Sequence, residues 1–162
     1  MNNIKPLTLP PVQRLLSLIE TPKSNLDKLL CNDTRLLDSG ASCHMTGLEN
    51  LLHHVCNINP IPVELPNGTQ TLAMKKGLVS LSPKLILRDV LYVPHLRCSL
   101  ISIAQLVNDV YCTVTFTPRL CAIHDLTTRN LIGVAEPGKG VYFYKGEAND
   151  GVQANKATAY EL

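Results

Sequence analysis

The chain has 162 residues, of which 45% are hydrophobic and 17% are charged. This length fits one domain with a real core, and the composition excludes a wholly disordered, collagen-like or coiled-coil chain. The formal net charge is +2 and no basic run exceeds the pair Lys75–Lys76, so the sequence shows no direct nucleic-acid interface built on phosphate neutralisation.

The first 33 residues are interpreted as a linker that contains one short helix. Three prolines before residue 12 exclude a helix there, whereas apolar residues recur at near-helical spacing over residues 12–20. No basic flank precedes an apolar core at the N-terminus, and no apolar stretch reaches the roughly 18 residues of a membrane helix. We therefore expect an intracellular protein that is not secreted and has no membrane partner.

A domain of mainly β structure is predicted over residues 34–145, where short apolar runs alternate with turn residues. Pro66-Asn67-Gly68 predicts a hairpin turn, because Asn and Gly tolerate positive φ. The expected strands are Arg35–Leu37, Ile61–Leu65, Thr69–Met74, Gly77–Leu81, Leu85–Leu87 with Val90–Val93, Cys112–Phe116, Leu120–Asp125, Asn130–Val134 and Gly140–Lys145.

One segment of this domain has helical rather than strand spacing. Leu100, Ile101 and Leu106 recur with a helical period, and Ser99 is placed to act as the N-cap, so we expect a helix over Ser99–Asn108. The tail over residues 146–162 is polar and is expected to be loosely ordered.

The stretch Leu36–Ser42 carries the chemistry. A strand delivers one carboxylate, Asp38, to a tight loop; Ser39 follows, and Gly40 lets the backbone approach a neighbouring chain. This pattern is typical of an aspartic protease half-site, in which two carboxylates share one proton. One chain supplies one such triplet, so the second must come from another copy in a homodimer. The alternative is a simple turn after a strand.

Histidines and cysteines in the following segment raise the possibility of a zinc site, because imidazole and thiolate are preferred zinc ligands. Their spacing fits no standard template, and the pair His53-His54 falls in an expected loop, so we assign no metal. Buried, reduced thiols are the favoured interpretation of the cysteines. The residues considered are Cys43, His44, His53, His54 and Cys56.

Several motifs occur in the order found in copia-type retrotransposon Pol polyproteins, which the chain resembles from about Leu7 to Leu162. The motifs are LLDSGASCHMTG (Leu36–Gly47), VELPNG (Val63–Gly68), VLYVP (Val90–Pro94), CSLISIAQL (Cys98–Leu106) and CAIHD (Cys121–Asp125) with Ile132-Gly133. The resemblance implies a retropepsin-like β-barrel with one internal α-helix and a short N-terminal helix.

The resemblance also implies site residues and partners. Asp38 matches the catalytic aspartate, Ser39 the hydroxyl that braces the paired loops, and Gly40 the turn glycine, with Ala41 and Ser42 completing the motif. The flap that closes over substrate falls within residues 63–79, with Asn67-Gly68 at its tip. The implied partners are a polyprotein peptide substrate and a second copy of the chain, with no cofactor, inside cytoplasmic virus-like particles.

The alternative is a catalytically inactive remnant of a degenerate element. Arg35 stands where many relatives carry tryptophan, and no glycine follows Val90–Pro94 at the position that retropepsins use before the helix.

Overall fold

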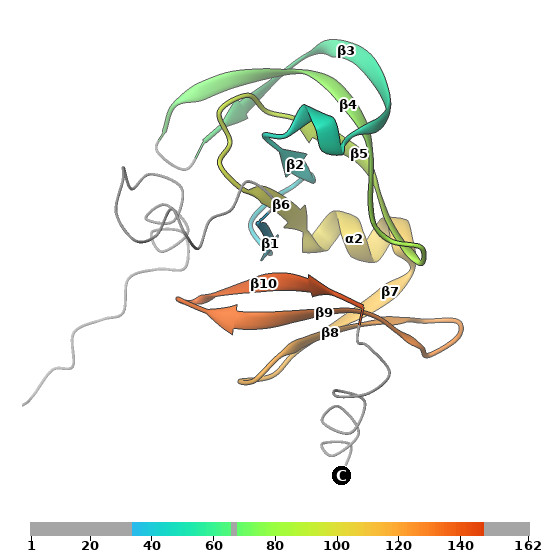
Figure 1. The fold of residues 1–162 in the computed structure, drawn as a ribbon. Helices are drawn as coiled ribbons and strands as arrows, with labels where there is room; N and C mark the ends of the chain where they lie inside the picture. Colours follow the sequence, from blue (N-terminus) through green and yellow to red (C-terminus); the bar gives the residue numbers. More distant parts are fainter. Residues whose placement is uncertain (1–33, 66–67, 148–162) are drawn as a thin grey trace, which may run out of the picture.

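The computed structural model describes residues 34–65 and 68–147, drawn in colour in Figure 1. The predicted N-terminal linker with its helix over 12–20, Asn67, and the tail from residue 148 lie outside these residues. The elements in chain order are β1 (Arg35–Asp38), β2 (Met45–Thr46), the 3-10 helix η1 (Glu49–Leu51), β3 (His53–Glu64), β4 (Gln70–Ser82), β5 (Leu85–Tyr92), β6 (Ser99–Ser102), α2 (Ile103–Val110), β7 (Cys112–Phe116), β8 (Cys121–Asp125), β9 (Leu131–Gly138) and β10 (Val141–Gly146).

All ten described strands belong to one sheet, in the order β3-β4-β5-β2-β6-β1-β10-β9-β8-β7. The sheet folds over strongly, so that β3, β4 and β5 lie at one end of the domain and β7 to β10 at the other (Figure 1). Strands β3 and β7 stay at the two edges of the described sheet, which therefore does not close as a barrel. The expectation of a mainly β domain with an internal helix is confirmed, whereas the described sheet is not the closed barrel of the retropepsin-like β-barrel expectation, which also allowed a partly open form.

Strands β1 and β6 lie in the middle of the sheet and run parallel to each other, with Leu36 opposite Leu100 and Leu37 opposite Ile101. Successive side chains of a strand point to opposite faces. Leu36 and Leu100 accordingly belong to one buried apolar cluster, and Leu37 and Ile101 to a second, larger one. The two central strands thus separate two cores and are buried on both faces.

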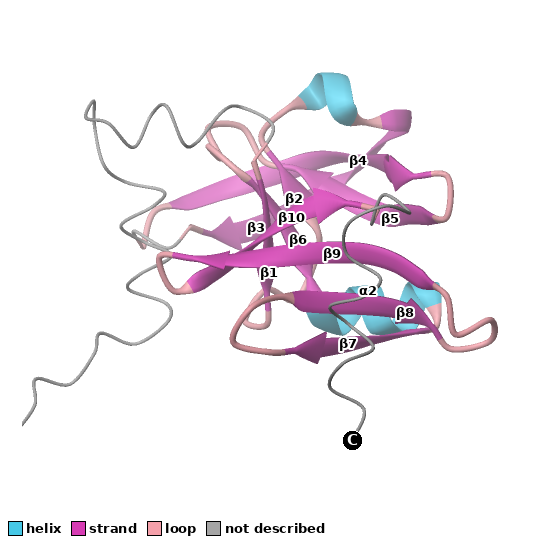
Figure 2. Cartoon of the chain, turned by 60° about the horizontal axis from the view of Figure 1, so that its bottom comes forward, coloured by secondary structure: helices cyan, strands magenta, loops and turns pink. Residues whose placement is uncertain are grey.

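The helix α2 packs against β5, β6 and β7, and Figure 2 shows it beside β7. Leu106 is its fully buried residue and enters the larger core. The side chain of Ser102 caps the helix by accepting a hydrogen bond from the backbone N–H of Gln105 at 3.2 Å. Tyr111 ends it in the left-handed conformation, a common helix terminus.

The predicted hairpin is confirmed. Strands β3 and β4 pair antiparallel, with Glu64 opposite Gln70, and Gly68 has a φ of 78° in the turn between them. Both strands are longer than the predicted runs Ile61–Leu65 and Thr69–Met74. Strand β3 begins at His53, and β4 continues through the predicted break before Gly77.

Two sequence-based expectations were wrong. Ser99–Ser102 is a strand rather than the first turn of the helix, which begins at Ile103 with Ser102 and not Ser99 as its cap. All four residues of β6 are buried, and a strand buried on both faces loses the alternation that would reveal it. His53-His54 lies in β3 rather than in a loop; most of that edge strand is exposed, so it shows no apolar alternation either.

Candidate active site

Strand β1 delivers Asp38 to an exposed loop. Leu36 and Leu37 are buried, Asp38 is half-buried, and Ser39 and Gly40 are exposed. Oδ1 of Asp38 accepts a hydrogen bond of 2.8 Å from the backbone N–H of Gly40. Asp readily forms this local turn with the chain two residues ahead. The loop therefore fixes the direction of the carboxylate within a single chain.

The backbone conformation at position 40 does not require a glycine, because the φ of Gly40 is not in the left-handed region. A Cβ added there would lie 3.3 Å from Oδ1 of Asp38, and no other described atom comes within 4 Å. Ser39 and Gly40 thus present an open surface on the outer side of the loop.

The inner side of the loop is fixed to the segment that joins β6 to α2. The hydroxyl of Ser102 donates to the backbone oxygen of Ala41 at 2.6 Å, and the backbone N–H of Ser102 donates to Nδ1 of His44 at 3.0 Å. The backbone N–H of His44 in turn donates to Oε1 of Gln105 at 2.8 Å. The loop from Asp38 to His44 therefore has an exposed side and an anchored side.

His44 is fully buried. Burial lowers the pKa of its imidazole from 6.5 to about 4, and the charge of Asp109 opposes this shift only partly. Because Nδ1 accepts from Ser102, the proton of the neutral ring is on Nε2, and Nε2 has no hydrogen-bond partner among the described residues. His44 is therefore a buried core histidine, a choice against a solvent-exposed position that the sequence left open.

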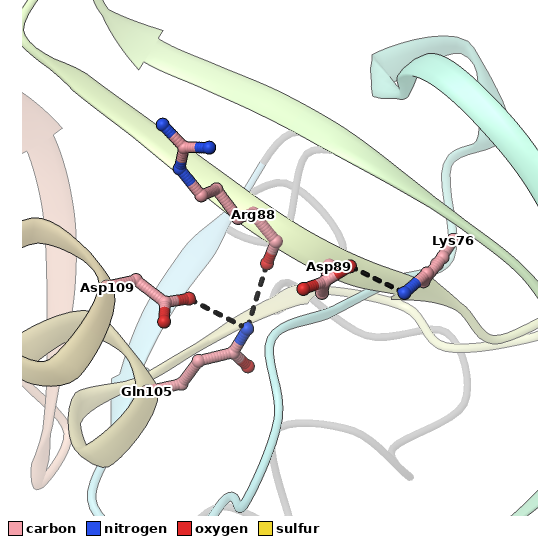
Figure 3. Close-up of polar contacts among 5 residues, drawn as sticks. All are labelled: Lys76, Arg88, Asp89, Gln105 and Asp109. Carbon is pink, nitrogen blue, oxygen red and sulfur yellow. Dashed lines mark hydrogen bonds and ion pairs between the residues drawn. The ribbon is translucent and has the colours of Figure 1, made fainter.

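Strand β5 contains a β-bulge. Arg88 and Asp89 together stand opposite the single residue Leu78 of β4, and Asp89 has a φ of 49°. Oδ1 of Asp89 forms an exposed ion pair of 2.7 Å with Nζ of Lys76 (Figure 3).

Gln105 connects this bulge to the loop. Its Nε2 donates to the backbone oxygen of Arg88 at 2.9 Å and to Oδ2 of Asp109 at 3.2 Å, as Figure 3 shows. Its Oε1 accepts from the backbone of His44. One side-chain amide thus joins the Asp38 loop, the helix and β5.

A second contact joins the same two segments farther along. The hydroxyls of Thr46 and Ser99 lie 2.8 Å apart, and both side chains are buried. The backbone N–H of Leu48 donates to Oγ1 of Thr46 at 3.2 Å. The segment after the loop is therefore also hydrogen-bonded to β6.

The β3–β4 hairpin, the expected flap, covers the smaller core. Val63 and Ala73 are buried on its inner face, in the same cluster as Leu36 and Cys98. Its outer face is apolar in part, because Leu72 and Met74 are more than half exposed. Gly68 is exposed in its turn.

The described cysteines are all free, and they do not share one environment. Cys98, Cys112 and Cys121 are buried, as expected, whereas Cys43 is half-buried and Cys56 is exposed. Burial, with a smaller contribution from the charge of Asp38, raises the pKa of the Cys98 thiol to about 12.

The described residues hold neither a cluster of metal-binding side chains nor a membrane-crossing helix. No three His, Cys, Asp or Glu side chains gather there as metal ligands would. No helix in the described part of the chain is long and apolar enough to cross a membrane.

Comparisons with known proteins agree with the motifs. Residues 36–111 match the family described as Pol polyprotein, beta-barrel domain. Two curated proteins of Arabidopsis thaliana, the retrovirus-related Pol polyproteins from transposons RE1 and RE2, are each 36% identical over 97 residues. The match covers 57% of this chain and 7% of either relative. No solved structure matches.

The sequence motifs contained the residues of the buried network without revealing their roles. His44 and Thr46 lie in LLDSGASCHMTG, and Ser99, Ser102 and Gln105 lie in CSLISIAQL. The signal available was the concentration of small polar residues in otherwise apolar segments. The structure brings these two segments together as one hydrogen-bonded unit.

Proposed function

We propose that residues 36–111, a β-barrel domain of a retrotransposon Pol polyprotein, supply one half of an aspartic endopeptidase active site. The observation that carries the proposal is the asymmetry of the Asp38 loop. Its inner side is fixed by one buried and two partly buried hydrogen bonds, while Ser39 and Gly40 are open on its outer side. Such a loop can meet an identical loop across a two-fold axis and bring two carboxylates together.

In the proposed dimer, one Asp38 is ionised and the other is protonated, because two carboxylates at one site share a proton. The ionised group takes a proton from water as the water oxygen attacks the peptide carbonyl carbon, and the protonated group gives its proton to the carbonyl oxygen. Collapse of the tetrahedral intermediate breaks the carbon–nitrogen bond, and the amine leaves with a proton from the dyad. No covalent enzyme intermediate forms.

The remaining residues of the loop have supporting roles in this proposal. Ser39 would hydrogen-bond across the dimer and brace the two loops, and Gly40 would leave room for their approach. Ala41 and Ser42 carry the chain from this interface to the anchored side. The hairpin with Asn67 and Gly68 at its turn would close over a polyprotein peptide, in a retropepsin-like arrangement, and the dimer would act inside cytoplasmic virus-like particles.

The competing proposal is an inactive domain with no substrate. One observation favours it: Asp38 already has a hydrogen-bond partner within its own turn. The family resemblance adds that Arg35 stands at a position where a tryptophan is expected. In this case Asp38 has only a structural role.

A cleavage assay separates the two proposals. The purified chain is incubated at about pH 6 with denatured casein and with a mixed library of fluorogenic peptides. We expect Asp38→Asn to abolish cleavage and to leave the circular dichroism spectrum unchanged. Glu136→Gln, which removes an exposed carboxylate from β9, is the matched control and keeps full activity.

Cleavage that survives Asp38→Asn would remove Asp38 from the mechanism. A wild-type chain that dimerises and cleaves neither substrate would favour the inactive domain.

A further inference from the structure

Three residues behind the active-site loop form a closed ring of hydrogen bonds. The backbone N–H of Ser102 donates to Nδ1 of His44, the backbone N–H of His44 donates to Oε1 of Gln105, and the backbone N–H of Gln105 donates to Oγ of Ser102. We call these three residues the His44–Ser102–Gln105 ring. Within the ring, each residue donates one hydrogen bond and accepts one.

Two further hydrogen bonds join the ring to the loop on one side and to the sheet on the other. Toward the loop, the hydroxyl of Ser102 donates to the backbone oxygen of Ala41 at 2.6 Å. Toward the sheet, Nε2 of Gln105 donates to the backbone oxygen of Arg88 in the β5 bulge at 2.9 Å. The ring therefore lies between Asp38, three residues before Ala41, and a fixed point of the fold.

We propose that His44, Ser102 and Gln105 are positioning residues, which set the direction in which the Asp38 loop presents its carboxylate. None of the three is proposed to touch substrate. The inference rests on the proposed function for its catalytic consequence, but its structural part, the immobilisation of residues 39–43, stands without it.

The directions of the hydrogen bonds explain why the ring acts as a unit. The Ser102 hydroxyl has one proton, and because it donates that proton to Ala41, it meets the N–H of Gln105 as an acceptor. His44 and Ser102 are fully buried, so a broken contact leaves a polar group without water to replace it. In such buried networks the members support one another, and loss of one weakens the rest.

The imidazole must be neutral for this arrangement. Protonated Nδ1 would point a second N–H at the N–H of Ser102, and the acceptor would be lost. The low pKa of His44, which burial holds near 4, agrees with a permanently neutral acceptor at the pH of the cytoplasm.

A pair of substitutions at His44 tests the proposal. In His44→Asn the side-chain oxygen can take the place of Nδ1 as acceptor, whereas His44→Leu offers no acceptor at all. Asn108→Ala, an exposed change on the same helix, is the control. Gln105→Met, at a half-buried position, tests the ring by a second route if His44→Leu does not fold.

Two readouts are measured on each variant. On a peptide that the wild-type chain cleaves, we expect His44→Leu and Gln105→Met to lower kcat by about tenfold or more, with KM and dimer affinity nearly unchanged, since small errors in orientation cost rate. In hydrogen exchange, we expect the amides of residues 39–43 to exchange about tenfold faster. His44→Asn should restore both values to near those of the wild type, and Asn108→Ala should change neither.

The two parts of the inference fail in different ways. Unchanged exchange at residues 39–43 in both His44→Leu and Gln105→Met would overturn the positioning role. Faster exchange with unchanged kcat would restrict the ring to a structural role and overturn its link to catalysis. If the wild-type chain cleaves nothing, the proposed function fails, while the exchange experiment still decides whether the ring holds the loop.

Discussion

At the scale of single residues, the buried side chains of the segment after Asp38, and not its exposed ones, hold it to the rest of the fold. From the sequence, the spacing of His44 from its neighbours argued against a metal site and left an exposed and a core position both open. The structure buries His44 completely and gives its Nδ1 a backbone donor from a residue 58 positions away. That partner could not be predicted, because β6 was expected to be part of a helix.

The burial of His44 predicts a loss of stability in acid. The unfolded chain binds a proton on this ring near pH 6.5 and the folded chain only near pH 4, so stability falls as the pH is lowered between these values. The difference corresponds to about 3 kcal/mol of unfolding free energy. The charged residues of β1, α2 and β5 are Arg35 and Asp38 on β1, Asp109 on α2, and Arg88 and Asp89 on β5.

Urea unfolding at pH 7, 6, 5 and 4 measures this effect. We expect the wild-type chain to lose about 3 kcal/mol more than His44→Asn across the range, because the variant has no group that titrates there. Carboxylates titrate in both proteins and cancel in the comparison. Parallel pH profiles would show that His44 does not control acid stability.

The two glycines of the motif LLDSGASCHMTG, Gly40 and Gly47, should differ in how much their substitution by alanine lowers the unfolding free energy. A Cβ at Gly47 would lie 1.8 Å from the backbone oxygen of Leu96, which cannot move away, whereas a Cβ at Gly40 meets one side-chain oxygen at 3.3 Å. We expect Gly47→Ala to lower the unfolding free energy by about 3 kcal/mol or more, and Gly40→Ala by less than about 1 kcal/mol. Thermal unfolding of the two variants provides the comparison. Equal losses would contradict the assignment of the close approach to Gly47.

At the scale of elements, the sequence predicted the strands that form short apolar runs between turn residues and failed at those without such bounds. β8 (Cys121–Asp125) and β10 (Val141–Gly146) were placed within a few residues of the predicted runs. The central strand β6 (Ser99–Ser102) was missed because it is buried on both faces and leads directly into α2. The part of β3 before Ile61 was missed. It forms a strand because it pairs with the long β4, and cross-strand pairing is not visible in a local pattern.

The bulge in β5 is an element-scale feature with its own test. Asp89 has a φ of 49°, a conformation that Asp and Asn tolerate and β-branched residues do not. We expect Asp89→Val to lower the unfolding free energy by about 1–3 kcal/mol. Asp89→Asn removes the exposed ion pair with Lys76 and should cost less than about 1 kcal/mol. Urea unfolding of both variants at pH 7 would contradict this account if Asp89→Asn were the more damaging change.

At the scale of the whole molecule, the resemblance to copia-type Pol polyproteins carried more information than the pattern of residues. The pattern predicted mainly β structure, and the resemblance predicted the family, which residues 36–111 match. Neither predicted that β3 and β7 would be the two edges of the described sheet. Sheet closure depends on the curvature summed over many strands and on which strands meet, and no single motif encodes it.

An open sheet offers a second way to associate, and this makes the oligomeric state a strict test of the proposed function. A free edge such as β7 can pair with another chain through its backbone, whereas the proposed active dimer joins through the Asp38 loops. Ser39→Ala removes the hydroxyl at the loops, and Thr113→Lys places a charge on exposed β7 without touching them.

Sedimentation equilibrium at pH 6, over a range of concentrations, distinguishes the two associations. We expect a reversible wild-type dimer whose Kd rises about a hundredfold in Ser39→Ala, since each of the two chains loses a buried hydrogen bond at about 1.4 kcal/mol. Thr113→Lys should leave the Kd unchanged. The reverse result would move the interface to β7, away from Asp38. A monomer at every concentration would leave one carboxylate where the reaction needs two, and the inactive domain would then be the better description.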